Sequence, residues 1–234
     1  MRQVYAGLFP PALVHRLRVE AERWHAGGKF WGIHSLREGD IGRVVLYATP
    51  KHLQQMRKNG EFSCFIGDSK AGRALVKDLR PFIAKCPVMG PAGRRLECLE
   101  ILMSMPGSKG QALHKDVWGE EGDDIMNCAV NLNGDENQTT VFPIYHCEKF
   151  PACVKPGSRE PLDWDSLPKG KVFWGFGETI AWYPWVIHGA PPNKSKQNAR
   201  FILFWNTESS VGSFTDAEVI TEAVFRDERE QWKV

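Results

Sequence analysis

Two histidines, an aspartate and an arginine are the residues whose types and spacing could do chemistry together. His114-Lys-Asp116 places an imidazole and a carboxylate two positions apart, and such residues share one face at the end of a β-strand. His188 comes later, at the end of an apolar run. Two imidazoles and one carboxylate form a facial triad, which suits Fe(II) and leaves coordination positions open for other ligands. His114, Asp116 and His188 are therefore our candidate metal ligands and catalytic residues.

Arg200 adds an anion-binding group twelve positions after His188. Its guanidinium stays charged and presents a planar fork that can hold a carboxylate through two parallel hydrogen bonds. The run Phe201–Trp205 that follows is aromatic and β-branched enough for a buried strand. Because a buried charge needs a partner, Arg200 predicts an anionic ligand. A dicarboxylate that chelates the metal at one end and pairs with Arg200 at the other would satisfy both groups.

Each of these features also has an ordinary structural explanation. A single histidine on an apolar strand is more often a hydrogen-bonded core residue than a metal ligand. An arginine that follows a loop is more often on the surface. The order and spacing of all four residues, with predicted strands in the required places, favour one shared site.

Helices are expected to dominate the first third of the chain. One helix is predicted from Pro10 to about His25, where Gly27-Gly28 ends it. A strand at 41–48 precedes a short helix to Lys58 that Thr49 would cap. A second amphipathic segment covers 68–86, and we expect Pro81 to kink or divide it.

Short strands follow from about Arg94 onward. They are predicted at 96–105, 110–114, 124–132, 138–142, 171–174 and 179–182, with two more ending at His188 and spanning Phe201–Trp205. They are too closely spaced for a parallel βαβ fold. The proline-rich stretch 143–170 is interpreted as an inserted loop, a natural lid or substrate-selecting segment.

The expected architecture is α+β with a mainly β core, in a single domain. Residues 1–93 form a mainly helical support and residues 94–206 form the β core. Residues 207–234 carry a C-terminal helix that begins at the capping box Thr215-Asp-Ala-Glu218 and runs to about Trp232.

The composition excludes few partners. With 30 basic and 28 acidic side chains, the formal net charge is +2, so nothing demands nucleic acid or an acidic membrane. The six cysteines form no CxxC pair, and reduced thiols are expected. There is no signal-peptide pattern and no run long enough to span a membrane. We expect a soluble cytoplasmic or nuclear protein of unknown oligomeric state.

Three stretches carry a resemblance to a known family. Gln111-Ala-Leu-His-Lys-Asp116, Gly177-Glu-Thr179, and His188-Gly-Ala-Pro-Pro-Asn-Lys-Ser195 leading to Arg200 resemble the Fe(II)/2-oxoglutarate-dependent dioxygenases. Those enzymes have the double-stranded β-helix (jelly-roll) fold, and the phytanoyl-CoA dioxygenase group is the most similar. The resemblance covers about 95–206.

The resemblance implies roles for individual residues. His114, Asp116 and His188 would bind Fe(II), and Arg200 would hold the distal carboxylate of the co-substrate 2-oxoglutarate. The enzyme would use dioxygen to hydroxylate a substrate C–H bond and release succinate and CO2. Relatives that halogenate replace the carboxylate ligand with a small residue, so Asp116 favours hydroxylation.

Two positions depart from the family pattern. Many relatives carry a hydroxyl residue two positions after the distal histidine, where this chain has Ala190. An assisting hydroxyl for 2-oxoglutarate would then come from elsewhere, and Thr139, Thr140 and Tyr183 are the candidates. AlkB-type nucleic-acid demethylases carry an arginine six positions after the clamp, where this chain has Asn206.

Several alternatives stay open. The substrate is expected to be a small or lipid-like molecule, with protein or nucleic acid as the alternative. A cupin-like metal- or ligand-binding protein without turnover is a second reading. Asn127 and Asn131 could point into the barrel or bond a neighbouring loop. The aromatic residues Trp118, Trp182 and Trp185 could line a substrate entrance or belong to the core.

Overall fold

A seven-stranded antiparallel sheet organises the computed structural model. The model describes residues 2–33, 41–58, 65–67, 69–89, 95–108, 126–134, 142–143, 171–172, 175–182, 190 and 192–207. The strand order is β1-β8-β5-β9-β4-β3-β2, and every pairing in the sheet is antiparallel. The seven strands are β1 (Arg2–Tyr5), β2 (Trp31–Ile33), β3 (Ile41–Ala48), β4 (Leu96–Ser104), β5 (Asn127–Asn131), β8 (Thr179–Trp182) and β9 (Arg200–Thr207).

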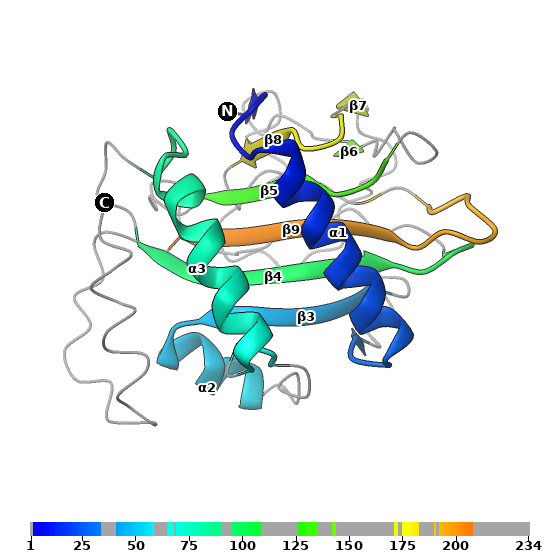
Figure 1. The fold of residues 1–234 in the computed structure, drawn as a ribbon, viewed down its shortest axis with the longest axis horizontal. Helices are drawn as coiled ribbons and strands as arrows, with labels where there is room; N and C mark the ends of the chain where they lie inside the picture. The colour runs from blue at the N-terminus through cyan, green and yellow to red at the C-terminus, as the bar shows by residue number, and fades with distance from the viewer. Residues whose placement is uncertain are drawn as a thin grey trace, which may run out of the picture.

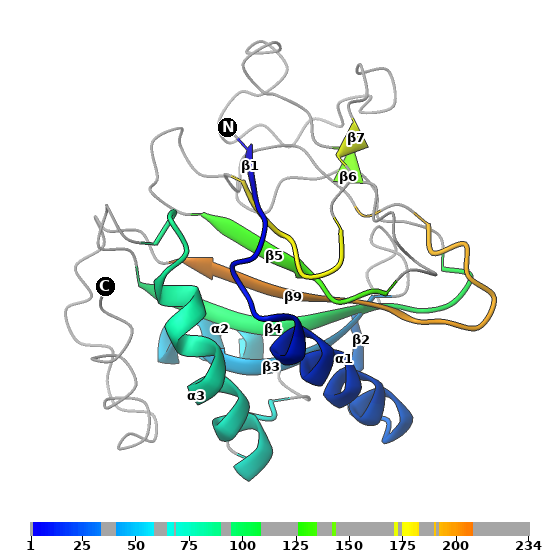
Figure 2. The ribbon, with the colours of Figure 1, turned by 45° about the horizontal axis from the view of Figure 1, so that its top comes forward.

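The order of the core strands is not their order along the chain. β9, the last strand of the described residues, lies between β4 and β5, and β8 lies on the far side of β5. β6 (Phe142–Pro143) and β7 (Lys171–Val172) pair in a separate two-stranded sheet. Figure 2 shows this pair on one side of the main sheet and α1 and α3 on the other. The mainly β core with supporting helices is therefore confirmed.

Helix α1 (Pro11–Ala26) lies across one face of the sheet beside α3 (Lys70–Ala84), as Figure 1 shows. Its buried side chains, Val14, Leu17, Ala21 and Trp24, recur at helical spacing. Proline at the first helical position suits a helix start, and Gly28 at φ +65° suits the end. Both predicted ends of this helix are confirmed to within a residue or two.

Helix α3 begins at the N-cap Ser69, whose hydroxyl accepts a hydrogen bond from the Gly72 amide at 2.9 Å. Pro81 lies inside the helix and does not divide it. A proline removes one backbone hydrogen bond, but Pro81 lies in the last turn, and the buried Leu79 and Ile83 on either side hold that turn on the core.

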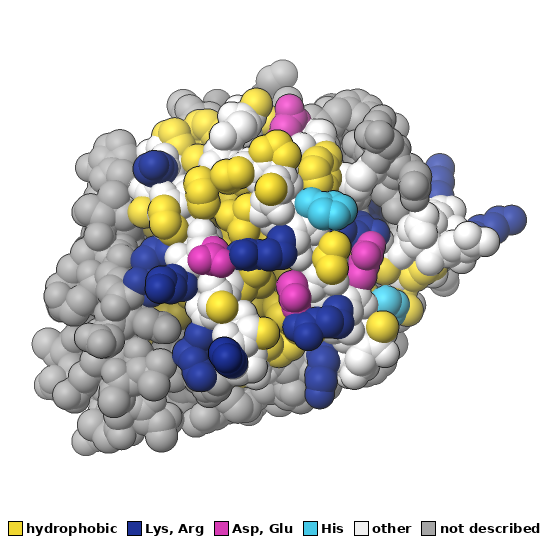
Figure 3. Space-filling view, viewed as in Figure 1, with side chains coloured by type: hydrophobic (Ala, Val, Ile, Leu, Met, Phe, Trp, Pro, Cys, Tyr) yellow, Lys and Arg dark blue, Asp and Glu magenta, His cyan; other side chains and the backbone are white. Residues whose placement is uncertain are grey.

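The outward surface of the two helices is charged and ion-paired. Figure 3 shows basic side chains spread over this surface, with acidic ones between them. Arg16 of α1 and Asp78 of α3 form an ion pair of 2.6 Å that links the helices. Both side chains are about half exposed, so the pair stabilises the fold little.

The two faces of the sheet differ in chemistry. Paired residues and strand alternation place mainly apolar side chains of β4, β5 and β9 on the face that α1 and α3 cover: Leu99, Ile101, Met103, Cys128, Val130, Phe201, Leu203 and Trp205, with Thr207 at the end of β9 as a buried polar exception. The opposite face carries buried polar residues, namely Glu100, Asn127, Asn131 and Arg200. Burying polar groups is unfavourable unless they are paired, so the helix-covered face is the core and the opposite face is where we look for a site.

Two edge strands were not predicted. No strand was predicted between Gly28 and Ile41, yet Trp31–Ile33 forms β2 against β3. Arg2–Tyr5 forms β1 against β8. Strands of three or four residues are too short to show alternation, and their hydrogen bonds come from a distant neighbour. The predicted strands at 110–114 and 187–188, the C-terminal helix and most of the 143–170 insertion lie outside the described residues.

Helix α2 (Pro50–Lys58) is attached to the start of β4 through a polar cluster. Thr49 caps it as predicted, since its hydroxyl accepts a hydrogen bond from the His52 amide at 3.3 Å. His52 Nδ1 lies 3.8 Å from Glu97 Oε1, and Asn206 donates to Glu97 Oε2 at 3.0 Å. Burial opposes the charged imidazole, but Cys98 and Glu97 together raise the pKa of His52 above its usual value.

The raised pKa predicts a pH-dependent stability difference between the wild type and His52→Gln. A folded-state pKa above the unfolded value of about 6.5 stabilises the fold most below that pH, and the contribution is lost as pH rises through the folded-state pKa. The difference in unfolding free energy between the wild type and His52→Gln should therefore be largest at pH 6 and smallest in alkaline buffer. Denaturant titrations across this range would check it, and Glu97→Gln should weaken the trend. A difference that grows with pH would contradict the assignment.

No helix in the described part of the chain is long and apolar enough to cross a membrane. Cys86, Cys98 and Cys128 are buried and are not in disulfides. The other three cysteines lie outside the described residues.

Candidate functional site

Arg200 is the first residue of β9, and its backbone pairs with Ser104 at the end of β4. The residue is only 6% exposed. Burial lowers the pKa of the Arg200 guanidinium to about 10, which still leaves it charged at neutral pH. The structure thus holds a permanent cation in a poorly hydrated position, where pairing with an anion is most favourable.

Strand alternation shows which face Arg200 belongs to. The neighbouring Phe201 ring lies under α1, with the Arg18 guanidinium 4.8 Å from its centroid and the His25 ring at 6.3 Å. Arg200 therefore lies on the opposite face, the one with the buried polar residues. Phe204 is on that face too, and its ring centroid is 6.1 Å from that of Trp182. Of the predicted entrance aromatics, Trp182 is thus buried on the same face as Arg200.

Asn127 and Asn131 also lie on the Arg200 face, since they pair with Asn206 and Ile202 of β9. The two alternatives left open for them are partly resolved. Asn131 Oδ1 accepts hydrogen bonds from the backbone and side-chain nitrogens of Asn133, at 2.9 and 2.6 Å. Asn131 therefore bonds the turn that follows β5.

The segment before Arg200 is joined to the end of β4 by Asn193. The Asn193 amide donates to Ser104 O at 3.1 Å and to Asn198 O at 2.9 Å, and its oxygen accepts from Ser195 N at 3.1 Å. Its backbone amide donates to Ser108 O at 3.1 Å. This buried side chain holds the segment that leads into β9 against the end of β4, and its bond to Asn198 O lies two residues before Arg200.

Asn193→Ala is expected to loosen this approach. It removes three hydrogen bonds and leaves two partly buried carbonyl groups without their donor, which costs about 1 kcal/mol or more for each unsatisfied group. The unfolding free energy should fall by a few kcal/mol. Equilibrium denaturation would measure the loss, with the exposed Lys194→Ala as the adjacent control. A loss equal to that of the control would contradict the assigned role of Asn193.

A turn on the other side of β5 also confirms a prediction. Gly177 adopts φ +75°, which favours glycine, and its amide donates to Asn131 O at 2.8 Å. The Glu178 carboxylate accepts from the Gly175 amide and closes the turn. The turn at Gly175–Gly177 therefore lies between the predicted strands at 171–174 and 179–182, and it leads directly into β8.

Arg200 is the one predicted site residue within the described part of the chain. The predicted metal ligands His114, Asp116 and His188, and the candidate 2-oxoglutarate contacts Thr139 and Tyr183, lie outside it. So do Thr140, Trp118 and Trp185. Among the described residues, no three histidine, cysteine, aspartate or glutamate side chains could share a metal ion.

The two residues that depart from the family pattern, Ala190 and Asn206, lie in different parts of the structure. Ala190 is half-buried in the segment before β9. Asn206 donates to Glu97, and its position six residues along β9 puts it about 20 Å from Arg200.

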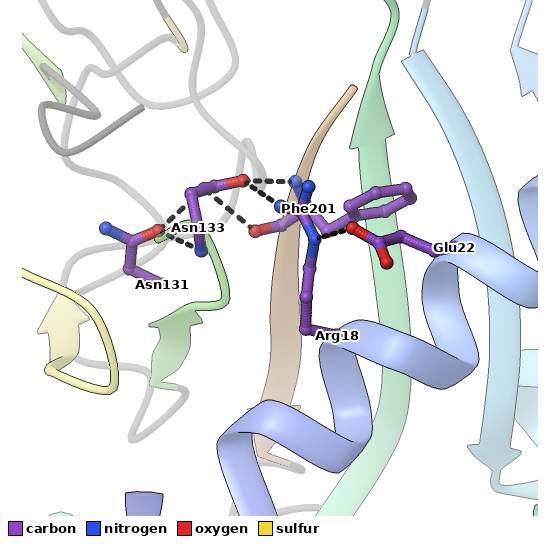
Figure 4. Close-up of polar contacts among 5 residues, drawn as sticks. All are labelled: Arg18, Glu22, Asn131, Asn133 and Phe201. Carbon is purple, nitrogen blue, oxygen red and sulfur yellow. Dashed lines mark hydrogen bonds and ion pairs between the residues drawn. The ribbon is translucent and has the colours of Figure 1, made fainter. Parts of the chain in front are cut away.

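Asn133 is a site-related residue that the sequence did not reveal. It was interpreted as part of a turn, yet its side chain bonds the strand that carries Arg200. Figure 4 shows the Asn133 amide between Phe201 of β9, Asn131 and Arg18 of α1. An Asn-Gly pair directly after a strand was the one available signal, and it predicts a turn without indicating a distant partner.

Comparison with known proteins finds similarity to solved structures but no match in sequence. No family model and no curated protein matches the sequence. The epimerase SnoN from nogalamycin biosynthesis, solved with Fe3+, alpha ketoglutarate and nogalamycin RO, superposes with a TM-score of 0.61 at 16% identity, covering 89% of this chain and 79% of SnoN. HygX from Streptomyces hygroscopicus, with nickel and 2-oxoglutarate bound, gives 0.57 at 14% identity, covering 96% of this chain and 89% of HygX.

A third similar structure has a peptide partner. A prolyl hydroxylase from Trichoplax adhaerens, in complex with a peptide of hypoxia inducible factor, gives a TM-score of 0.57 at 9% identity. The match covers 88% of this chain and 83% of that one. These likenesses show the fold: the chain has the jelly-roll architecture of 2-oxoglutarate-dependent oxygenases, as predicted. The phytanoyl-CoA dioxygenase group stays a prediction.

Proposed function

We propose that this protein is an Fe(II)- and 2-oxoglutarate-dependent oxygenase that hydroxylates a substrate C–H bond and releases succinate and CO2. The observation that carries the proposal is Arg200, a buried cation at the start of β9 in a jelly-roll fold. His114, Asp116 and His188 would hold the iron. Bound together, iron and 2-oxoglutarate would supply the oxidising chemistry with dioxygen.

Arg200 fits the distal carboxylate of 2-oxoglutarate. Its planar fork matches a carboxylate, and its burial reduces the screening of the ion pair by water. Two neighbours hold the backbone of Arg200 in place. Ser104 of β4 pairs with it, and the ring of the next residue, Phe201, packs under α1. A fixed guanidinium orients the co-substrate as well as binding it, so that the 2-oxo acid end is presented to the metal ligands.

We propose a small or lipid-like molecule as the substrate. The similar structures include one with nogalamycin RO and one with a peptide, so both kinds of substrate occur on this fold. The sequence lacks the second arginine of nucleic-acid demethylases, and Asn206 at that position bonds Glu97 instead. Oxygenation of a protein or nucleic acid is the alternative that a substrate panel would reveal.

Succinate release tests the proposed activity. Purified protein with Fe(II), 2-oxoglutarate and dioxygen should release succinate, and a matching substrate should raise the rate and gain an oxygen atom from labelled dioxygen. Removing iron with a chelator, or excluding dioxygen, should abolish the release. Absent turnover across the panel with iron demonstrably bound would instead indicate a cupin-like binding protein.

A further inference from the structure

We infer that Asn133 and Arg18 are positioning residues for the 2-oxoglutarate clamp, because they hold the backbone beside Arg200. The inference rests on the proposed function, since it assumes that Arg200 binds the co-substrate. Neither residue carries chemistry itself. Figure 4 shows the connection from α1 through Arg18 and Asn133 to Phe201, the residue directly after Arg200.

Asn133 extends the β5 side of β9 beyond the last strand pair. The register of β5 against β9 ends at Asn131, which pairs with Ile202. One residue further along β9, the Phe201 amide donates to Asn133 Oδ1 at 2.8 Å, and Asn133 Nδ2 donates to Phe201 O at 3.1 Å. The side-chain amide thus pairs with both backbone groups of Phe201, as a strand residue would. The Leu132 amide also donates to Phe201 O at 3.2 Å, so loss of the Asn133 side chain would leave the Phe201 carbonyl with Leu132 and would leave the Phe201 amide without its acceptor.

The Asn133 amide is fully used and therefore has one orientation. Its two donor hydrogens serve Asn131 Oδ1 and Phe201 O, and its oxygen accepts from Phe201 N and from Arg18 Nη1 at 3.0 Å. Asn133 is completely buried, where an unmet hydrogen bond is most unfavourable. Arg18 can only donate, so it requires the amide oxygen to face it and stabilises the orientation that Phe201 needs.

Arg18 contacts Phe201 in two ways. Besides its bond to Asn133, its guanidinium lies 4.8 Å from the centroid of the Phe201 ring, within range of a cation–π interaction. Glu22 Oε1 accepts from Arg18 Nε at 2.6 Å and orients the guanidinium from the same helix. Helix α1 therefore holds both the backbone and the ring of the residue next to the clamp.

The position of the Phe201 backbone determines the position of the Arg200 backbone. The two residues share a peptide plane, and their side chains leave β9 on opposite faces. A shift or twist of the strand at Phe201 therefore moves the Arg200 guanidinium on the other face. A two-point pairing with a carboxylate weakens steeply when its geometry is lost. Loss of the Asn133 bonds should then reduce 2-oxoglutarate affinity although no contact with the ligand is removed.

The experiment measures 2-oxoglutarate binding by calorimetry, with manganese(II) in place of iron so that no turnover occurs. Arg18→Ala and Asn133→Asp are the test variants. Asn133→Asp keeps the acceptor but removes both donated hydrogen bonds. We expect affinity to fall about 10-fold or more, as for other residues that orient a binding group. KM for 2-oxoglutarate should rise by more than kcat falls, and Arg18→Lys should restore part of the affinity.

Matched controls come from the same helix. Arg16→Ala removes an exposed ion pair two positions before Arg18 on α1, and Arg23→Ala removes the ion pair with Glu20 on the same helix. Both should bind 2-oxoglutarate as the wild type does. Hydrogen exchange gives a readout independent of ligand: the Phe201 amide, whose acceptor is Asn133, should exchange faster in the test variants and unchanged in Arg16→Ala.

The outcomes separate this inference from the proposed function. If Arg200→Ala binds 2-oxoglutarate as the wild type does, the clamp assignment and the proposed function are wrong. If Arg200→Ala loses binding while Arg18→Ala and Asn133→Asp keep it, only the positioning roles are wrong. Should Asn133→Asp fail to fold, Arg18→Ala decides alone, because the Arg18 side chain is partly exposed and its removal frees the Asn133 amide to turn without itself removing a bond made by the Phe201 backbone.

Discussion

Arg200→Ala is expected to weaken 2-oxoglutarate binding by roughly 30-fold to several thousand-fold. Removing one partner of a buried, hydrogen-bonded charge pair costs about 2–5 kcal/mol, and each 1.4 kcal/mol is a factor of ten in affinity. Arg200→Lys should recover part of the loss, since an ammonium keeps the charge but not the planar fork. Calorimetric titration of the metal-loaded variants measures both effects.

The same substitutions should not destabilise the ligand-free protein in proportion. Burial lowers the pKa of Arg200, because a guanidinium in a poorly hydrated position loses solvation. Arg200→Met, which keeps most of the apolar length, is expected to lower the unfolding free energy by much less than it lowers the free energy of 2-oxoglutarate binding. Lost binding together with lost stability would indicate instead that Arg200 is a structural residue.

Asp116→Ala is the second substitution with a large expected effect. Loss of the single carboxylate of the triad should reduce iron affinity and succinate release by about 100-fold or more, beyond what loss of an outer residue costs. His146→Ala is the control, because His146 is a histidine of the same part of the sequence that is not assigned to the triad. Succinate release and bound iron are measured in parallel. Full iron-dependent decarboxylation of 2-oxoglutarate by Asp116→Ala would contradict the triad.

The elements that the sequence predicted well are those with long, regular patterns. Helix α1 shows four buried positions at helical spacing, and the eight-residue strand β9 contains the five-residue run of aromatic and branched residues Phe201–Trp205. In β4, Glu100 interrupts an apolar run because that position faces away from the helices, where Arg43 pairs with it at 3.0 Å. The short edge strands β1 and β2 had no such pattern, since their pairing partners decide their conformation.

The residues of the site also differ in how well the sequence predicts them, and for the same physical reason. Arg200 could be predicted because a charged residue at the start of an apolar strand, twelve positions after a histidine, is unusual without an anion to bind. The support given by Asn133 could not be predicted. Its bonds to Phe201 cross 68 positions of sequence and depend on where β5 ends beside β9. Asparagine near glycine predicts a turn, and nothing local distinguishes an asparagine that also pairs with a distant strand.

The most direct test of the proposed function compares two ligands in two proteins. 2-Oxopentanoate has the metal-binding end of 2-oxoglutarate but lacks its distal carboxylate. The wild type, loaded with manganese(II), should prefer 2-oxoglutarate, and Arg200→Ala should bind both ligands alike, giving a coupling energy of at least about 2 kcal/mol. A wild type that binds the two ligands equally, or an Arg200→Ala variant that keeps the preference, would contradict the assignment of Arg200 as the 2-oxoglutarate clamp.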